Sequence, residues 1–256
     1  MKKLLFLLSL LPFLSACDNI DVSDRYIEEG SVLVSRNVLL EEFTGQLCTN
    51  CPDAHRIIES LEEQYGDHLI VVSIHAMKGA FGIPAPYGLL QEEGDEYARY
   101  WGTSALPAGM FNRTSGLVDY KEFSTVVREE LKKTTPLELE LQAQLSEDGK
   151  NIEVFTTLVT PTAMEGNLQL WVVESGIVAM QIDNGVQRPD YVHNNVFRAC
   201  VNGLWGQPEP LESNVVKYVS NEMPLDEAWN VENLAIVGFY YNSTGVVQVE
   251  KCSVKR

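Results

Sequence analysis

Two cysteines separated by two residues form the motif of this sequence best suited to chemistry. Residues 48–52 read Cys-Thr-Asn-Cys-Pro, and they lie where a predicted strand passes into a predicted helix. We therefore expect the sulfur of Cys48 to be exposed near unpaired backbone N–H groups and the positive end of the helix. Such surroundings favour the thiolate, the form that takes part in disulfide exchange. Cys48 would attack a substrate sulfur, and Cys51 would resolve the mixed disulfide.

Other uses of a Cys-x-x-Cys pair need neighbours that the sequence supplies only in part. A structural zinc site needs two more ligands, and His55 and His75 are single candidates without a second Cys-x-x-Cys pair. Covalent haem attachment needs a His directly after the second Cys, where Pro52 stands. An inert, closed disulfide in a binding protein stays open as an alternative, because a fold does not determine a function. We expect no metal and no cofactor.

The segments around the cysteine pair predict a βαβ unit. Residues 37–43 and the nearly continuous apolar run 69–74 are typical of buried strands. Between them, apolar residues recur at helical spacing, Pro52 suits the first turn of a helix, and Gly66 suits the position just past its end. Strand, helix and strand in this order predict two parallel strands. We expect further helices at 91–101 and 120–131 and short strands at 106–111 and 117–118, which completes an α/β domain over residues 33–134.

From Pro136 onward the apolar period changes to two. Leu137, Leu139 and Leu141 alternate with polar residues, and residues 147–150 supply a turn. Further strand candidates lie at 151–159, 167–174, 194–201, 213–219, 233–241 and 246–254. About seven short strands separated by turns predict an antiparallel β-sandwich over residues 136–256.

The N-terminus has the layout of a lipoprotein export signal. Two lysines are followed by an apolar run from Leu4 to Leu14 and by a cysteine at position 17. The run is too short to span a bilayer as a stable helix. We predict a signal peptide over residues 1–16, acyl groups on Cys17, and an acidic tether over residues 17–32 that connects the lipid to the folded body. Ordinary secretion with an unmodified Cys17 is the alternative.

Charge and cysteine usage narrow the class of protein further. The formal net charge is −17, and removing residues 1–16 takes away two lysines, which leaves −19. Nucleic acid is excluded as a partner, because binding its phosphates needs clustered Lys and Arg. With Cys17 lipidated, four cysteines remain in an oxidising compartment, and three connectivities exist. We favour Cys48–Cys51 with Cys200–Cys252, because each bridge then lies inside one predicted domain; free thiols at Cys200 and Cys252 are the alternative.

Residues 42–52, together with residues 105–109, resemble the thioredoxin superfamily. In that family a buried acid six residues before the first Cys assists proton transfer from the second, and Glu42 stands at that position. A strand-leading proline in cis packs beside the disulfide, and Pro107 matches it. The resemblance therefore implies that Glu42 and Pro107 act with Cys48 and Cys51 as catalytic residues. A solvent-facing Glu42 and an ordinary trans Pro107 are the alternatives.

The chain as a whole resembles the 28-kDa outer-membrane lipoprotein family of Bacteroidota. The likeness is carried by the lipid signal, by the cysteine pair, and by residues 106–113, 191–198 and 202–206. It implies a thioredoxin-like domain followed by an immunoglobulin-like β domain, a location on the outer membrane, and a kinship with proteins regarded as adhesins or receptors. Members often carry a second His where Asn195 stands, so we interpret His193 as a structural residue. Arg198 and Trp205 are likewise typical of packing or surface positions.

Two functions follow as hypotheses. The first is a membrane-tethered thiol–disulfide oxidoreductase whose partners are protein thiols and disulfides. The second is a surface adhesin or receptor-like protein that binds extracellular protein ligands and uses the thioredoxin-like part as a scaffold.

Overall fold

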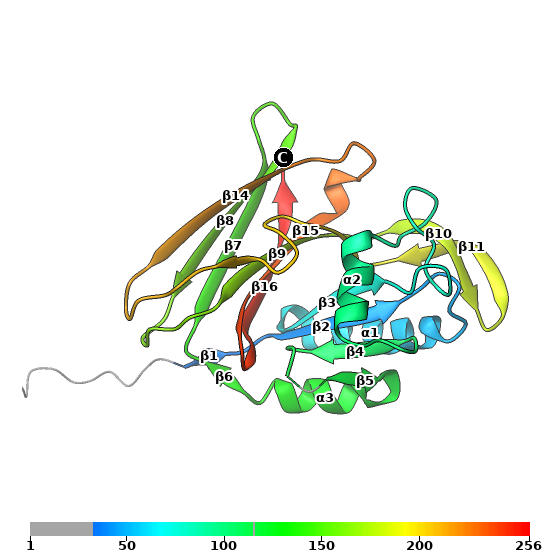
Figure 1. Cartoon of the computed structure of the whole chain (residues 1–256), viewed down its shortest axis with the longest axis horizontal. Coiled ribbons are helices and arrows are strands. Elements are labelled where there is room, and N and C mark those ends of the chain that lie inside the picture. Colours follow the sequence, from blue (N-terminus) through cyan, green and yellow to red (C-terminus); the bar gives the residue numbers. More distant parts are fainter. Residues whose placement is uncertain (1–32, 115) are drawn as a thin grey trace, which may run out of the picture. The chain divides into compact units, whose positions relative to one another are not determined.

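The computed structural model of the chain, shown in Figure 1, describes residues 33–114 and 116–256. The predicted signal peptide, Cys17 and the acidic tether lie outside these residues. Within the two described ranges, no helix has both the length and the apolar character that a membrane crossing requires.

A parallel βαβ unit positions the Cys-x-x-Cys motif. Its elements are β2 (Val38–Thr44), α1 (Cys51–Tyr65), the 3-10 helix η2 (Gly66–His68) and β3 (Leu69–His75). Both strands are buried along their whole length and pair in parallel. Helix α1 has Pro52 in its first turn and buries Ile58 against the sheet. The residue that follows the helix is Gly66, whose φ of 54° suits a residue without a side chain. The predicted order of strand, helix and strand is confirmed.

The remaining elements of the N-terminal half are β1 (Val34–Ser35), α2 (Glu92–Tyr100), β4 (Ala108–Phe111), β5 (Leu117–Asp119), the 3-10 helix η3 (Tyr120–Glu122), α3 (Phe123–Glu130) and β6 (Thr134–Thr135). Among them, β4 and β5 extend the sheet beyond β2, β1 and β6 form a separate two-stranded sheet, and helices lie against both faces. Strand β4 is antiparallel to β2, and β5 is antiparallel to β4. Helices α1 and α3 share an apolar core with Leu40 of β2, whereas α2 packs with Phe43 in a different core. Residues 40 and 43 of a strand point to opposite faces, so α2 lies on the other side of the sheet.

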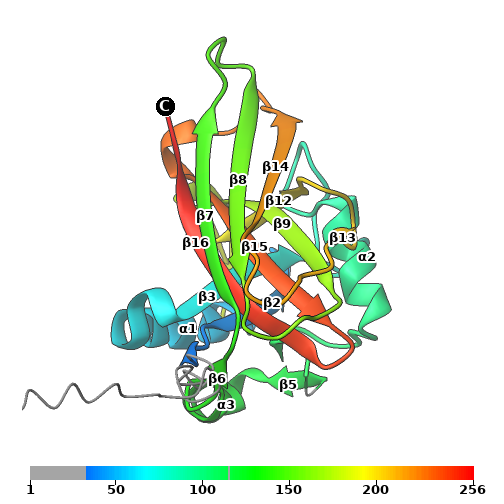
Figure 2. The ribbon, with the colours of Figure 1, turned by 90° about the vertical axis from the view of Figure 1, so that its left-hand side faces the viewer.

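The C-terminal half consists almost entirely of strands. They are β7 (Glu138–Leu145), β8 (Asn151–Val159), β9 (Asn167–Glu174), β10 (Ile177–Asp183), β11 (Val186–His193), β12 (Val196–Cys200), β13 (Gln207–Pro208), β14 (Lys217–Pro224), β15 (Leu234–Asn242) and β16 (Gly245–Lys255), with the 3-10 helix η4 (Val231–Asn233) before β15. Strands β14, β8 and β7 run side by side next to β16 (Figure 2). Leu158 of β8 meets Val172 of β9 and Ile236 of β15 in one apolar core.

The expectation of an α/β thioredoxin-like domain followed by a separate, all-β immunoglobulin-like sandwich is wrong. One mixed sheet of 12 strands runs through both halves, in the order β14-β8-β7-β16-β15-β9-β12-β3-β2-β4-β5 with β13 beside β9. The junction is β12, which pairs with β9 on one side and in parallel with β3 on the other, where Val196 is opposite Ser73. One apolar core contains Phe43 of the first half and Trp171 of the second.

The prediction of two separate domains failed because an apolar strand pattern shows that a strand is buried but not which strand lies beside it. The run from Leu168 to Val173 in β9 is buried on both faces, since one face packs on the core shared with Phe43 and the other on the core shared with Leu158. An apolar run predicts burial but not the strand that will pair with it. The pattern therefore located the strands and gave no information on their neighbours.

The predicted disulfide between Cys200 and Cys252 is also wrong, because both residues are free thiols. Cys200 of β12 is paired with Trp171, whereas Cys252 of β16 is paired with Ile236, which is paired with Val172. Neighbouring residues 171 and 172 point to opposite faces of the sheet. The two thiols accordingly lie in different apolar cores, on opposite faces and separated by β9 and β15.

Candidate functional site

The loop between β2 and α1 holds the cysteine pair as a closed disulfide. Cys48 and Cys51 are bonded to each other, with their Cα atoms 5.5 Å apart, and the amide of Cys48 donates to the carbonyl of Gly45 at 3.0 Å. Cys51 is the first residue of α1, so the motif lies at a junction of strand and helix, as the sequence predicted. The expected exposure of the first sulfur is wrong, however, since Cys48 is 2% exposed and Cys51 is fully buried.

The hairpin of β10 and β11 covers this loop. It forms a separate two-stranded sheet, inserted between β9 and β12, and it lies near the ends of β2 and β3 (Figure 1). The fully buried side chain of Gln181 donates from Nε2 to the carbonyl of Cys48 at 3.0 Å and to that of Gly45 at 3.2 Å. From the same hairpin, the amide of Ile182 also donates to the carbonyl of Gln46 in this loop, at 2.8 Å. Sequence analysis missed this hairpin, because residues 177–193 carry no chemical motif.

Glu42 lies on the face of β2 that α1 covers, and its side chain is fully buried. The solvent-facing alternative is therefore excluded. Neither carboxylate oxygen has a hydrogen-bond partner among the residues that the structure describes. The nearest basic group is Nε2 of His55, 3.5 Å from Oε1. A buried carboxylate without hydrogen bonds is costly, which makes Glu42 a candidate for proton exchange rather than for structural support.

His55 connects Glu42 with the hairpin. It follows Cys51 by four residues on α1, so the two side chains lie on the same face of the helix. Its Nε2 lies 2.9 Å from Oγ1 of Thr44, and its Nδ1 lies 2.8 Å from the hydroxyl of Tyr191. Burial, followed by the charge of Glu59, raises the pKa of Tyr191 to about 12. The Tyr191 hydroxyl therefore keeps its proton, and it can donate to Nδ1 or accept from it, depending on the tautomer of His55. The other nitrogen, Nε2, faces Thr44 and Glu42.

Two further histidines lie beyond His55 and are held neutral. The ring centroids of His75 and His193 are 5.3 Å apart, and both side chains are buried. Burial, together with repulsion from His55, lowers the pKa of His193 to about 4, and carbonyls of the hairpin oppose this shift. Burial, then the neighbouring His193 and His55, lowers the pKa of His75 well below its ordinary value. Neither ring nitrogen of His193 has a hydrogen-bond partner among the described residues, and its structural role stays a prediction.

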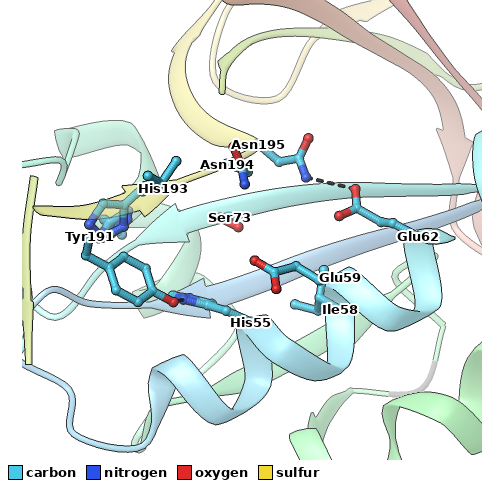
Figure 3. Close-up of a pocket in the computed structure, with 11 residues that line it drawn as sticks. His55, Ile58, Glu59, Glu62, Ser73, Tyr191, His193, Asn194 and Asn195 are labelled. Atoms are coloured by element: carbon cyan, nitrogen blue, oxygen red, sulfur yellow. Dashed lines mark hydrogen bonds between the residues drawn. The ribbon is translucent and has the colours of Figure 1, made fainter. Parts of the chain in front are cut away.

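A small cavity opens between α1 and the end of β11 (Figure 3). Its volume of about 30 Å³ suffices for one or two water molecules, and polar side chains line it. His55 and Glu59 lie on the α1 side of the cavity, opposite Tyr191 and His193 (Figure 3). A water molecule in this cavity would be a proton acceptor next to His55 and Tyr191. The cavity is too small for an organic ligand.

Asn195, where relatives were expected to show a second His, closes the far end of this cavity. Its Nδ2 donates to Glu62 at 2.8 Å, the bond drawn in Figure 3, and its Oδ1 accepts from Lys251 at 2.6 Å. The backbone carbonyl of Asn195 accepts from the amide of Ser73 at 2.8 Å, which helps to join β12 to β3. Asn195 is thus a junction residue of the continuous sheet.

The other residues singled out by the sequence lie around this site or elsewhere in the fold. The Leu106–Pro107 peptide is cis, and Pro107 directly precedes Ala108, the partner of Phe43 in the sheet. Arg198 forms a partly buried ion pair with Glu174 at 3.3 Å. Across residues 33–114 and 116–256, no group of three or more His, Cys, Asp or Glu side chains has a geometry that could hold a metal ion.

Comparison with known proteins was made on both sequence and structure. The family model described as outer membrane protein Omp28 matches residues 94–256. HBP35 of Porphyromonas gingivalis is similar in structure, with a TM-score of 0.70 and 15% sequence identity over 86% of this chain and 76% of that chain. A structural-genomics protein from Agrobacterium tumefaciens has a TM-score of 0.50 and 15% identity over 85% of this chain and 94% of that chain. These two likenesses show the fold alone.

A domain of the outer membrane lipoprotein Omp28 from Porphyromonas gingivalis covers 47% of this chain and 89% of its own, at 18% identity and a TM-score of 0.34, which carries no structural argument. No curated protein matches the sequence. The likeness to HBP35 spans both predicted halves of the chain, in agreement with one continuous sheet.

Proposed function

Because the chain belongs to the Omp28 family and is therefore an outer-membrane lipoprotein, we propose that acyl groups on Cys17 anchor it there and that its Cys48–Cys51 disulfide exchanges with thiols of other envelope proteins. The observation that carries the proposal is the buried Glu42 carboxylate, 3.5 Å from a histidine that shares a helix face with Cys51. A structural disulfide needs neither a buried, unbonded acid nor an imidazole beside it.

The exchange reaction balances without any further oxidant. A substrate thiolate attacks Sγ of Cys48, the S–S bond to Cys51 breaks, and Cys51 leaves as a thiolate that takes up a proton. A second substrate thiolate then attacks the substrate sulfur of the mixed disulfide and releases Cys48. The substrate dithiol is oxidised to a disulfide, the Cys48–Cys51 pair is reduced to a dithiol, and the two protons lost by the substrate are taken up by the two cysteines.

In this scheme the chain's own residues move the proton. His55 is one helical turn from Cys51, and its Nε2 faces Glu42, so the pair can pass a proton to the leaving Cys51 thiolate and recover it when the disulfide forms again. Tyr191 fixes the ring orientation through Nδ1. The proton-exchanging histidine therefore lies on α1 and contacts the hairpin through Tyr191.

Access to Cys48 requires movement of the β10–β11 hairpin, since the residue is 2% exposed. The contacts that close the site are backbone and amide hydrogen bonds to Gly45, Gln46 and Cys48. A protein substrate that pairs with the same loop could take over these bonds and so offset the cost of displacing the hairpin.

Trapping in the native envelope tests the proposal. A Cys51→Ser variant of the full-length lipoprotein cannot form the Cys48–Cys51 disulfide, but its Cys48 thiolate can attack the disulfide of an oxidised substrate, which is the reverse of the step described above. Because Cys51 is absent, the mixed disulfide is not resolved, so we expect adducts that are visible on non-reducing gels and absent after reduction. The Cys48→Ser/Cys51→Ser double variant is the control, and it should trap nothing. If both variants trap the same adducts, or if neither variant traps any, disulfide exchange through Cys48 is contradicted.

A binding protein with an inert disulfide is the second candidate, and the burial of both sulfurs under the hairpin favours it. In that case the loop is cross-linked for stability, and an adhesin or receptor function would use other surfaces. Binding of the full-length protein to extracellular proteins that survives the Cys48→Ser/Cys51→Ser change, together with absent trapping, would support this candidate over the first. Deleting residues 136–256 is no test, because the sheet is continuous across that boundary.

A further inference from the structure

An aromatic pocket lies on the face of the sheet that α2 covers, apart from the disulfide site. Its volume is about 530 Å³, within the range of small-molecule sites. Tyr100 and Trp101 at the end of α2, Trp205 after β12, Tyr241 of β15 and Arg113 after β4 line it. Segments distant in sequence thus converge on one pocket, none of whose residues lines the small cavity beside His55.

Aromatic rings form the walls. The ring centroids of Tyr100 and Trp205 are 4.4 Å apart, and those of Tyr100 and Trp101 are 4.8 Å apart. The side chain of Tyr100 is 65% exposed at the mouth. Rings with an open face and a polar edge favour flat ligands whose C–H groups can lie against the π-surface.

Unpaired donors line the pocket as well. Arg113 has a side chain only 3% exposed and gives Nε and Nη2 to the carboxylate of Glu41 at 2.6 and 3.3 Å. Its Nη1, like Nε1 of Trp101, is buried without a hydrogen-bond partner in the described part of the chain. The guanidinium carbon of Arg113 lies 4.7 Å from the ring centroid of Phe239 and 4.8 Å from that of Tyr241, so cation–π contacts within the protein surround this group. Buried donors normally find acceptors, so the N–H group of Trp101 points to a ligand that brings an oxygen atom.

The charge balance decides between an anionic and a neutral ligand. Glu41 is fully buried and neutralises Arg113, so the pair contributes no net charge to the pocket. The whole chain has a formal net charge of −17, which repels anions. At the rim, Oδ1 of Asn242 is already occupied by Thr244, so that its Nδ2 can donate to a ligand. A neutral molecule with several acceptor oxygens fits better than a carboxylate.

We propose that this pocket binds a neutral carbohydrate, with a pyranose ring lying on Tyr100 and Trp205 and its oxygens accepting hydrogen bonds from Nδ2 of Asn242 and Nε1 of Trp101. A pyranose presents C–H groups on its faces and hydroxyl oxygens around its edge, which matches aromatic walls and N–H donors. The proposal does not depend on the redox proposal, because it uses a different face of the sheet and different residues.

Tryptophan fluorescence of the full-length protein tests the proposal, since Trp101 and Trp205 line the pocket. The protein is kept in a detergent without a sugar headgroup, because a glycoside detergent would compete. The probes are maltotriose, cellotriose and N,N′-diacetylchitobiose, with glucuronic acid and benzoate as anionic probes. We expect saturable binding of at least one neutral sugar and weaker or absent binding of both anions.

Variants of exposed tyrosines provide the matched comparison, because neither should affect folding. Tyr100→Ala should weaken sugar binding at least fivefold, whereas Tyr218→Ala, which alters a tyrosine 77% exposed on β14, should change it less than twofold. Absence of binding to all three sugars, preference for glucuronic acid or benzoate, or equal affinity of the two variants would each overturn the proposal.

Discussion

Glu41 and Glu42 are consecutive residues of β2, both fully buried, whose side chains point to opposite faces of the sheet. Glu41 is paired with Arg113 on the face of α2, whereas Glu42 faces His55 on the face of α1. One strand thus contributes one acid to the aromatic pocket and one to the disulfide site. The different surroundings of the two carboxylates lead to opposite predictions for the same substitution.

Glu41→Gln should destabilise the protein strongly. The change leaves a buried guanidinium without its counter-charge, and breaking one partner of a buried pair costs about 3 kcal/mol or more. Urea unfolding of the variant and the wild type at pH 7 measures the loss. A free energy of unfolding equal to that of the wild type would contradict the role of this ion pair.

Glu42→Gln should leave the free energy of unfolding unchanged or raise it, because the carboxylate accepts no hydrogen bond from the described residues. It should nevertheless slow disulfide exchange by roughly a hundredfold or more, since the proton relay through His55 is lost. Stopped-flow oxidation of a dithiol peptide by the Cys48–Cys51 disulfide measures the rate. Exchange at the wild-type rate would remove Glu42 from the mechanism.

Gln181→Ala should make the disulfide more accessible. The change removes the two hydrogen bonds to the carbonyls of Gly45 and Cys48, so the hairpin opens more often and reduction by dithiothreitol should be about tenfold faster. Gln187→Ala is the matched control, because Gln187 lies on the same hairpin and is exposed. If both variants are reduced at the same rate, the hairpin does not gate the site.

Acid should destabilise the fold through His193. Its pKa is about 4 in the folded protein and near 6.5 when unfolded, so between these values only the unfolded chain binds the proton and stability falls as the pH falls. The loss is complete near pH 4 and amounts to roughly 3 kcal/mol. Burial, with the charge of Asp67, raises the pKa of Glu250 to about 7, which acts in the opposite direction.

The difference between the wild type and His193→Gln isolates the histidine from this opposing effect. The variant should lose less stability than the wild type between pH 6.5 and 4, as measured by urea unfolding at several pH values. Parallel pH profiles would show that His193 does not contribute.

Cys200 and Cys252 should behave as buried thiols. Burial raises the pKa of each to about 11, so iodoacetamide at pH 8 should label neither in the folded protein. After unfolding without reductant, both should be alkylated. If neither cysteine is labelled in unfolded, unreduced protein, the two form a disulfide and the assignment as free thiols is contradicted.

The sequence predicted those features that depend on local pattern. The periodicity around Ile58 located α1 and the run 69–74 located β3, whereas the burial of Glu42 and the cis peptide before Pro107 followed only from the resemblance. Partners that depend on the tertiary fold were not predictable. Nothing in residues 177–193 indicates that a hairpin covers Cys48, and apolar alternation does not indicate that β12 pairs with β3. Cys200 and Cys252 were predicted to pair because both fell inside one predicted domain, a criterion that ignores the face of the sheet on which each lies.

The reduction potential of the Cys48–Cys51 pair tests the redox proposal most directly. The full-length protein is equilibrated with glutathione buffers of known ratio, and the reduced fraction is counted by alkylation, with Cys200 and Cys252 labelled separately after unfolding. Exchange predicts a potential between about −120 and −270 mV, the range of known exchange proteins. A potential below about −300 mV, typical of structural disulfides, would contradict it.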